Sequence, residues 1–90
     1  MKLLIELRGM SDISPVERQA AEQRYREALE VAFGSPQAVW ARHEAAKSAT
    51  DPRSRDIARW EQVEAVAAKL ALGGLLRHAS EASFHLIGLH

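Results

Sequence analysis

Residues 14–34 read SPVERQAAEQRYREALEVAFG, and this stretch carries both a helix start and a helix stop. Ser14 is a favoured N-cap residue, Pro15 fits the first helical position, and Glu17 completes a capping box three residues after the cap. Gly34 can adopt the left-handed backbone conformation that ends many helices. The pattern predicts a helix over residues 15–33.

The cap-then-proline pattern occurs twice more, at Ser35-Pro36 and at Asp51-Pro52. It predicts a second helix over about residues 36–48 and a third, longer helix over about residues 52–79. We expect the third helix to turn a wide apolar stripe toward the core. This stripe consists of Ile57, Trp60, Val63, Val66, Ala67, Leu70 and Ala71.

Two adjacent glycines, Gly73 and Gly74, interrupt the third predicted helix. Each glycine inside a helix costs about 1 kcal/mol relative to alanine. Because the apolar spacing continues at Leu75, Leu76 and Ala79, we expect the helix to pass through the glycines with a kink.

Short apolar runs lie at both ends of the sequence, over about residues 2–8 and 84–89. In the first run Leu3, Ile5 and Leu7 share one face, which is the alternation of a strand with one buried side. The sequence therefore predicts one helix-dominated α+β domain over residues 1–90, with three helices and a short strand at each terminus. An all-α bundle is the alternative.

Composition excludes several classes of function. The 90 residues contain no cysteine, which rules out disulfides, thiolate metal sites and cysteine nucleophiles and fits a reducing compartment. Twelve basic residues balance twelve acidic ones, so no net field attracts nucleic acid or an anionic membrane. No apolar run approaches the roughly 18 residues that span a bilayer. We expect a cytoplasmic protein.

The two terminal strands suggest self-association. A two-stranded sheet is marginal by itself and exposes two edges, so we expect a homodimer in which strands pair across an edge or third helices pack together. A monomer whose helices cover both strands is the alternative. The partner-binding candidates are Leu4, Trp40, Trp60 and Leu89, although tryptophans at such positions are more often core residues. No cofactor is expected.

A DNA-binding regulatory protein is the first alternative function. Five basic residues flank the junction of the second and third helices, namely Arg42, Lys47, Arg53, Arg55 and Arg59. A helix-turn-helix protein reads the major groove with the first residues of its second helix. Asp51 and Asp56 lie among these basic residues and disfavour contact with phosphates.

A small metal-dependent enzyme is the second alternative. His78, Glu81 and His85 have the spacing of ligands on one helix face, but the serines between them favour a helix exit that would scatter the three side chains. His43-Glu44 resembles half of a zinc-protease motif, yet position 47 holds lysine in place of the second histidine. We therefore expect a small non-catalytic protein-protein interaction or adaptor module.

Overall fold

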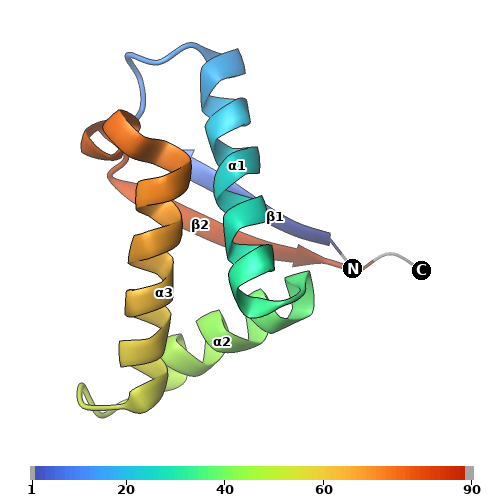
Figure 1. Ribbon diagram of the computed structural model, residues 1–90, viewed down its shortest axis with the longest axis vertical. Coiled ribbons are helices and arrows are strands. Elements are labelled where there is room, and N and C mark those ends of the chain that lie inside the picture. The colour runs from blue at the N-terminus through green and yellow to red at the C-terminus, as the bar shows by residue number, and fades with distance from the viewer. Residues whose placement is uncertain (1, 89–90) are drawn as a thin grey trace.

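The computed structural model describes residues 2–88 and has the predicted fold class. In chain order the elements are β1 (Lys2–Arg8), α1 (Pro15–Phe33), α2 (Pro36–Ser48), α3 (Arg55–Leu72), the 3₁₀ helix η1 (Gly73–His78) and β2 (Glu81–Ile87) (Figure 1). Three helices and a strand near each end confirm the helix-dominated α+β prediction, and the all-α bundle is wrong. Within residues 2–88, no helix is both long enough and apolar enough to cross a membrane.

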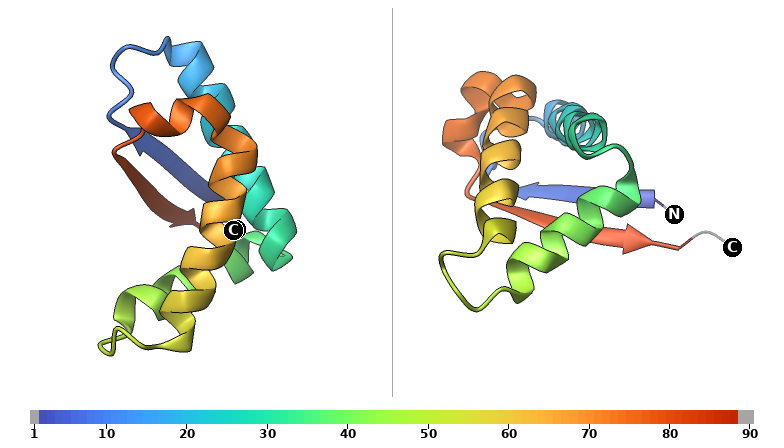
Figure 2. Two further views of the ribbon diagram at one scale, coloured as in Figure 1. Left: turned by 60° about the vertical axis from the view of Figure 1, so that its left-hand side comes forward. Right: turned by 60° about the horizontal axis from the view of Figure 1, so that its bottom comes forward.

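The two strands form an antiparallel sheet that the helices cover on one face only (Figure 2). The register pairs Lys2 with Ile87 and Arg8 with Glu81, so the two ends of the described chain lie side by side. The backbone amide of Leu7 on β1 donates a hydrogen bond to Oε2 of Glu22 on α1, with an N–O distance of 2.7 Å. This hydrogen bond ties the outer edge of β1 to the helical layer.

The core lies between the sheet and the helices. Leu3, Ile5 and Leu7 alternate along β1 and are buried, as their spacing predicts. They face the helical layer, in which α1 and α2 lie nearest to β1. The buried apolar residues are Leu3, Ile5, Leu7, Met10, Ala21, Tyr25, Leu29, Val39, Ala67, Ala68, Ala71 and Leu72.

Helices α1 and α2 begin and end where the sequence predicts. Oγ of Ser14 accepts a hydrogen bond from the amide of Glu17 at 3.2 Å, and Oγ of Ser35 accepts one from the amide of Ala38 at 3.0 Å. Gly34 has a φ of 105° and its N–H donates to the carbonyl of Glu30. Local chemistry therefore sets these three helix ends.

Helix α3 begins at Arg55 and not at residue 52, because a second cap lies further along the chain. Oδ1 of Asp51 accepts from the amide of Arg53 at 2.9 Å, which folds Asp51-Pro52 into a turn. Oγ of Ser54 then accepts from the amide of Asp56 at 3.2 Å and caps the helix.

Helix α3 ends at Leu72, so the expected continuous helix through the glycines is wrong. Gly73 takes a φ of 50°, which ends the α-helix, and the chain continues as a 3₁₀ helix to His78. Strand β2 begins at Glu81, three residues before the predicted start, because Glu81 pairs with Arg8. The predicted strand end at residue 89 lies outside the described residues.

Candidate functional site

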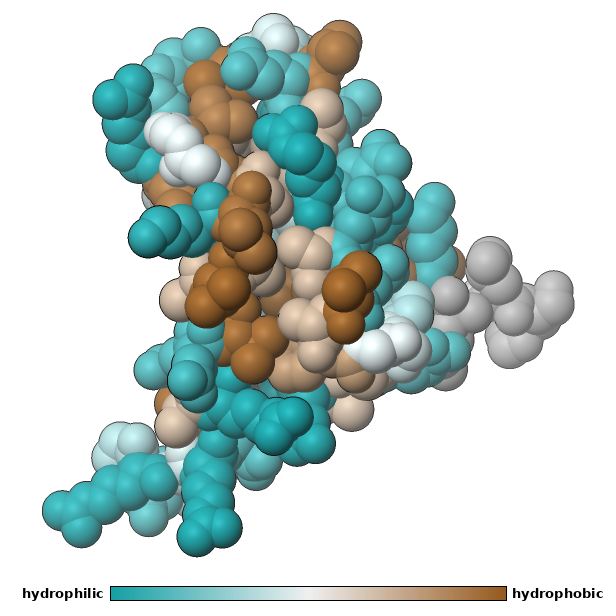
Figure 3. All heavy atoms as spheres, in the orientation of Figure 1, coloured by the Kyte–Doolittle hydropathy of each residue, from teal (hydrophilic) through white to brown (hydrophobic). Residues whose placement is uncertain are grey.

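An apolar groove runs between α1 and α3 on the side of the helical layer that faces away from the sheet. Three large aliphatic side chains stand in solvent along it: Val31 is 84% exposed, Val66 57% and Leu70 79%. Figure 3 shows the apolar surface gathered over this part of the molecule, with hydrophilic residues around it. The groove has a volume of about 690 Å³.

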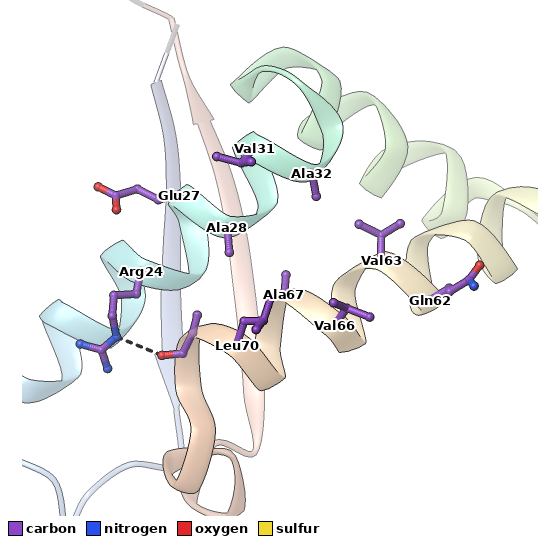
Figure 4. Close-up of a pocket in the computed structure, with 11 residues that line it drawn as sticks. Arg24, Glu27, Ala28, Val31, Ala32, Gln62, Val63, Val66, Ala67 and Leu70 are labelled. Atoms are coloured by element: carbon purple, nitrogen blue, oxygen red, sulfur yellow. Dashed lines mark hydrogen bonds between the residues drawn. The ribbon is translucent and has the colours of Figure 1, made fainter.

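Small residues form the floor of the groove and larger ones form its walls (Figure 4). Ala28 and Ala32 on α1 lie near Ala67 on α3, and their short side chains keep the groove open. One end is closed by Arg24, whose Nε donates to the carbonyl of Ala71 at 3.0 Å. Glu27 and Gln62 are the other polar lining residues.

The rotation of α3 about its own axis decides which apolar residues reach the core. The structure buries Ala67, Ala68, Ala71 and Leu72 and leaves Val66 and Leu70 in solvent. The expectation that the whole stripe faces the core is therefore wrong for Val66 and Leu70. The alanines let α3 approach its neighbours closely, and this orientation turns the bulkier side chains outward.

No groove is predicted from the sequence, in which Val66 and Leu70 are expected in the core, although one signal is present. Val31 falls outside the apolar stripe of α1, on the polar side of the helix. An aliphatic side chain at this position does not contribute to the core. On α3 the apolar stripe is wider than one packing face needs. Val31 and the wide stripe of α3 are apolar residues beyond those that one core needs, and together they indicate a second apolar surface.

An aromatic cluster lies under α2. The ring of His43 is 4.5 Å from that of Phe84 and 5.1 Å from that of Trp60, measured between centroids. Trp60 also stacks on Phe33 at 5.6 Å, and Trp40 lies 6.0 Å from His43. Trp40 and Trp60, proposed from the sequence as partner-binding residues, are half-buried here and pack against the core.

Among the histidines of residues 2–88, only His43 packs within the aromatic cluster. Its Nδ1 is buried, has no hydrogen-bond partner within residues 2–88, and lies 3.7 Å from Oε1 of Glu44. Burial lowers the pKa of His43, and Glu44 opposes this effect while Lys47 adds to it. The imidazole is therefore neutral at pH 7. His43 and Glu44 do not form a hydrogen-bonded catalytic pair.

The candidate nucleic-acid residues are all exposed. They surround the junction of α2 and α3, where Asp51 and Asp56 are exposed as well. The start of α3 at Arg55 leaves Arg53 in the turn rather than on the helix. The five basic residues are Arg42, Lys47, Arg53, Arg55 and Arg59.

The alternative metal ligands lie on different elements. His78 belongs to η1, and its Nδ1 lies 3.0 Å from Oδ2 of Asp12, whereas Glu81 and His85 belong to β2. Within residues 2–88, no three histidine or acidic side chains come close enough together to hold a metal ion. The helix exit that separates them follows from Gly73.

Leu4 lies on the open face of the sheet, where it pairs with His85 and is partly exposed. Leu89, its proposed counterpart, lies outside the described residues. Comparison of the chain with protein-family models, curated proteins and solved structures finds no match.

Proposed function

We propose that the chain is a small non-catalytic protein-interaction module that binds its partner in the α1/α3 groove. The observation that supports this proposal is the exposure of Val31, Val66 and Leu70 on two adjacent helices. Contiguous apolar surface rimmed by polar residues marks interaction sites on proteins of this size. Isolated exposed valines or leucines would carry no such argument.

The lining of the groove favours binding over chemistry. Its polar members are Arg24, Glu27 and Gln62, and Arg24 already donates to the carbonyl of Ala71. The rest of the lining is alanine, valine and leucine. A groove between two helices with an apolar floor suits a partner helix that presents aliphatic side chains at three- and four-residue spacing.

A cytoplasmic location is part of the same proposal. The sequence has no cysteine, and this fits a reducing compartment. An interaction module that relies on packing and has no disulfide suits that environment.

Site-specific photocrosslinking in cells tests the proposed function. A photoreactive amino acid is placed at position 31 or 70 in the groove and, as the control, at position 16. Val16 is the matched control because it is also an exposed valine on α1, at 78%, and does not line the groove. We expect protein adducts at positions 31 and 70 and none at position 16.

Two results would contradict the proposal. Equal crosslinking at all three positions would mean that the groove has no special role. Adducts to nucleic acid or lipid in place of protein would assign the surface to another class of ligand.

A further inference from the structure

We propose that the groove is filled by a second copy of this chain, related by a twofold axis that runs parallel to the groove. The proposal rests on the proposed function and names its partner. In this arrangement α1 of one copy lies over α3 of the other. The α1 and α3 helices of both copies together lie between the two sheets. The interface is isologous, as in most homodimers.

Contacts within one copy fix which residues of α1 and α3 lie level with each other. Arg24 reaches the carbonyl of Ala71, and Phe33 stacks on Trp60, so the two helices run antiparallel. Counting from Arg24 and Ala71, Glu27 is level with Ala68, and counting from Phe33 and Trp60 it is level with Val66. Lys69 therefore lies about one to three residues, or about 1.5 to 4.5 Å, from the level of Glu27. An axis parallel to the helices preserves these levels between copies.

The charges at this level are complementary between copies. Glu27 lies on the rim of the groove on α1, and Lys69 lies on the outer side of α3. Both are exposed, and within residues 2–88 they form no ion pair with each other. The twofold axis brings Glu27 opposite Lys69 of the partner subunit, and the symmetry makes this pair twice.

The other twofold arrangement does not form this pair. An axis across the groove would lay α1 on α1 and α3 on α3, so Glu27 would face α1 of the partner subunit and Lys69 would face its α3. The pair between Glu27 and Lys69 therefore distinguishes the two axes.

The apolar side chains also fit the parallel axis. Leu70 is near the level of Arg24 and Ala28, so it enters the groove of the partner subunit where alanine leaves room. Val31 is near the level of Val63 and Val66, so it meets aliphatic side chains across the interface. Each copy thus supplies both a projecting residue and the space that receives it.

The flat shape of the chain leaves room for such an interface. The chain exposes 6034 Å² and measures 37 × 35 × 20 Å, and the groove opens on one of its broad faces (Figure 3). A standard interface buries roughly 800 Å² on each partner, which is a small part of this exposed area.

The first test is the mass in solution. Light scattering at micromolar concentration should give twice the 10.0 kDa of one chain. Leu70→Asp should shift the mass to that of one chain, and the matched control Val16→Asp should leave the dimer intact. Circular dichroism checks that both variants stay folded, which their exposed positions favour.

A charge exchange tests the orientation of the two copies. Glu27→Lys and Lys69→Glu should each raise the dimer dissociation constant by about tenfold, because each turns two attractive pairs into repulsive ones. The double variant should recover the parent value, and an equimolar mixture of the two single variants should form heterodimers. A mixture that stays monomeric while the parent is dimeric would overturn the parallel axis.

The two proposals fail in different ways. A parent that stays at the mass of one chain across the micromolar range overturns the dimer, whatever the crosslinking shows. If residue 70 then crosslinks to a different protein, the interaction module stands with another partner. If residues 31 and 70 give no protein adduct in that case, both proposals fall.

Discussion

The hydroxyl of Tyr25 on α1 donates a hydrogen bond to Oε1 of Glu64 on α3, with the two oxygens 2.6 Å apart. Tyr25 is buried, and its pKa is raised first by burial and then by the hydrogen bond and the negative charge of Glu64. The bond joins the two helices that form the groove, on the side nearer the sheet. It therefore helps to set the spacing of the groove walls.

Tyr25→Phe should destabilise the fold by about 1.5–3 kcal/mol, because the variant removes a hydrogen bond to a charged group and leaves the Glu64 carboxylate without its donor. The ring is retained, so its edge contact with Phe84 at a centroid distance of 6.3 Å is kept. Urea denaturation monitored by circular dichroism measures the difference. An unchanged midpoint would show that water replaces the hydroxyl at no cost.

Stability should fall as the pH drops below the ordinary histidine pKa of about 6.5. The folded chain resists protonation of His43, since burial lowers the pKa of this residue, whereas the unfolded chain takes up the proton. His43→Phe should flatten the pH dependence of the unfolding free energy between about pH 7 and 5.5. His85→Gln is the comparison variant, because it also removes a histidine but at an exposed position outside the aromatic cluster.

Gly73→Ala should destabilise the fold by about 1–2 kcal/mol, because Gly73 has a φ of 50° that alanine adopts only with strain. Gly74→Ala is the matched control, since its φ is not in the left-handed region. Apart from its chain neighbours and the adjacent helix backbone, nothing lies within 4 Å of a methyl group added at either position, so backbone conformation separates the two variants. Thermal unfolding should rank Gly73→Ala below Gly74→Ala, and equal melting temperatures would contradict this reasoning.

Leu4→Lys should leave the mass in solution unchanged if the dimer forms through the groove. Leu4 lies on the open face of the sheet, and the amide of Leu7 at the free edge of β1 is already bonded to Glu22. Light scattering on Leu4→Lys and Leu70→Asp side by side compares the two surfaces. If Leu4→Lys is a monomer and Leu70→Asp is a dimer, the interface is formed by the strands, as the sequence suggests, and not by the groove.

The sequence predicts helix ends well wherever one residue decides them. Ser14, Ser35 and Gly34 act through hydrogen bonds to neighbours three or four positions away, so their effect is visible in the sequence. At the start of α3 two caps compete, and Ser54 prevails over Asp51 because Asp51 is used in the preceding turn. At Gly73 the continued apolar spacing was misleading, since it persists in the 3₁₀ helix.

The groove could not be predicted from the sequence. Whether Val66 or Ala67 faces the core depends on how closely α3 approaches α1, which is a property of the packed structure. Trp60 and Trp40, the most conspicuous residues of the sequence, pack into the aromatic cluster with His43. The less conspicuous Val31 stands in solvent.

The pairing of β1 with β2 joins two segments that are synthesised at different times. Residues 2–8 leave the ribosome before the three helices, and their partners, residues 81–87, leave it after the helices. The three helices can form from local contacts before β2 is synthesised. During this time the apolar segment with Leu3, Ile5 and Leu7 has no partner strand. A nascent chain stalled before Glu81 would therefore expose a strand competent to aggregate.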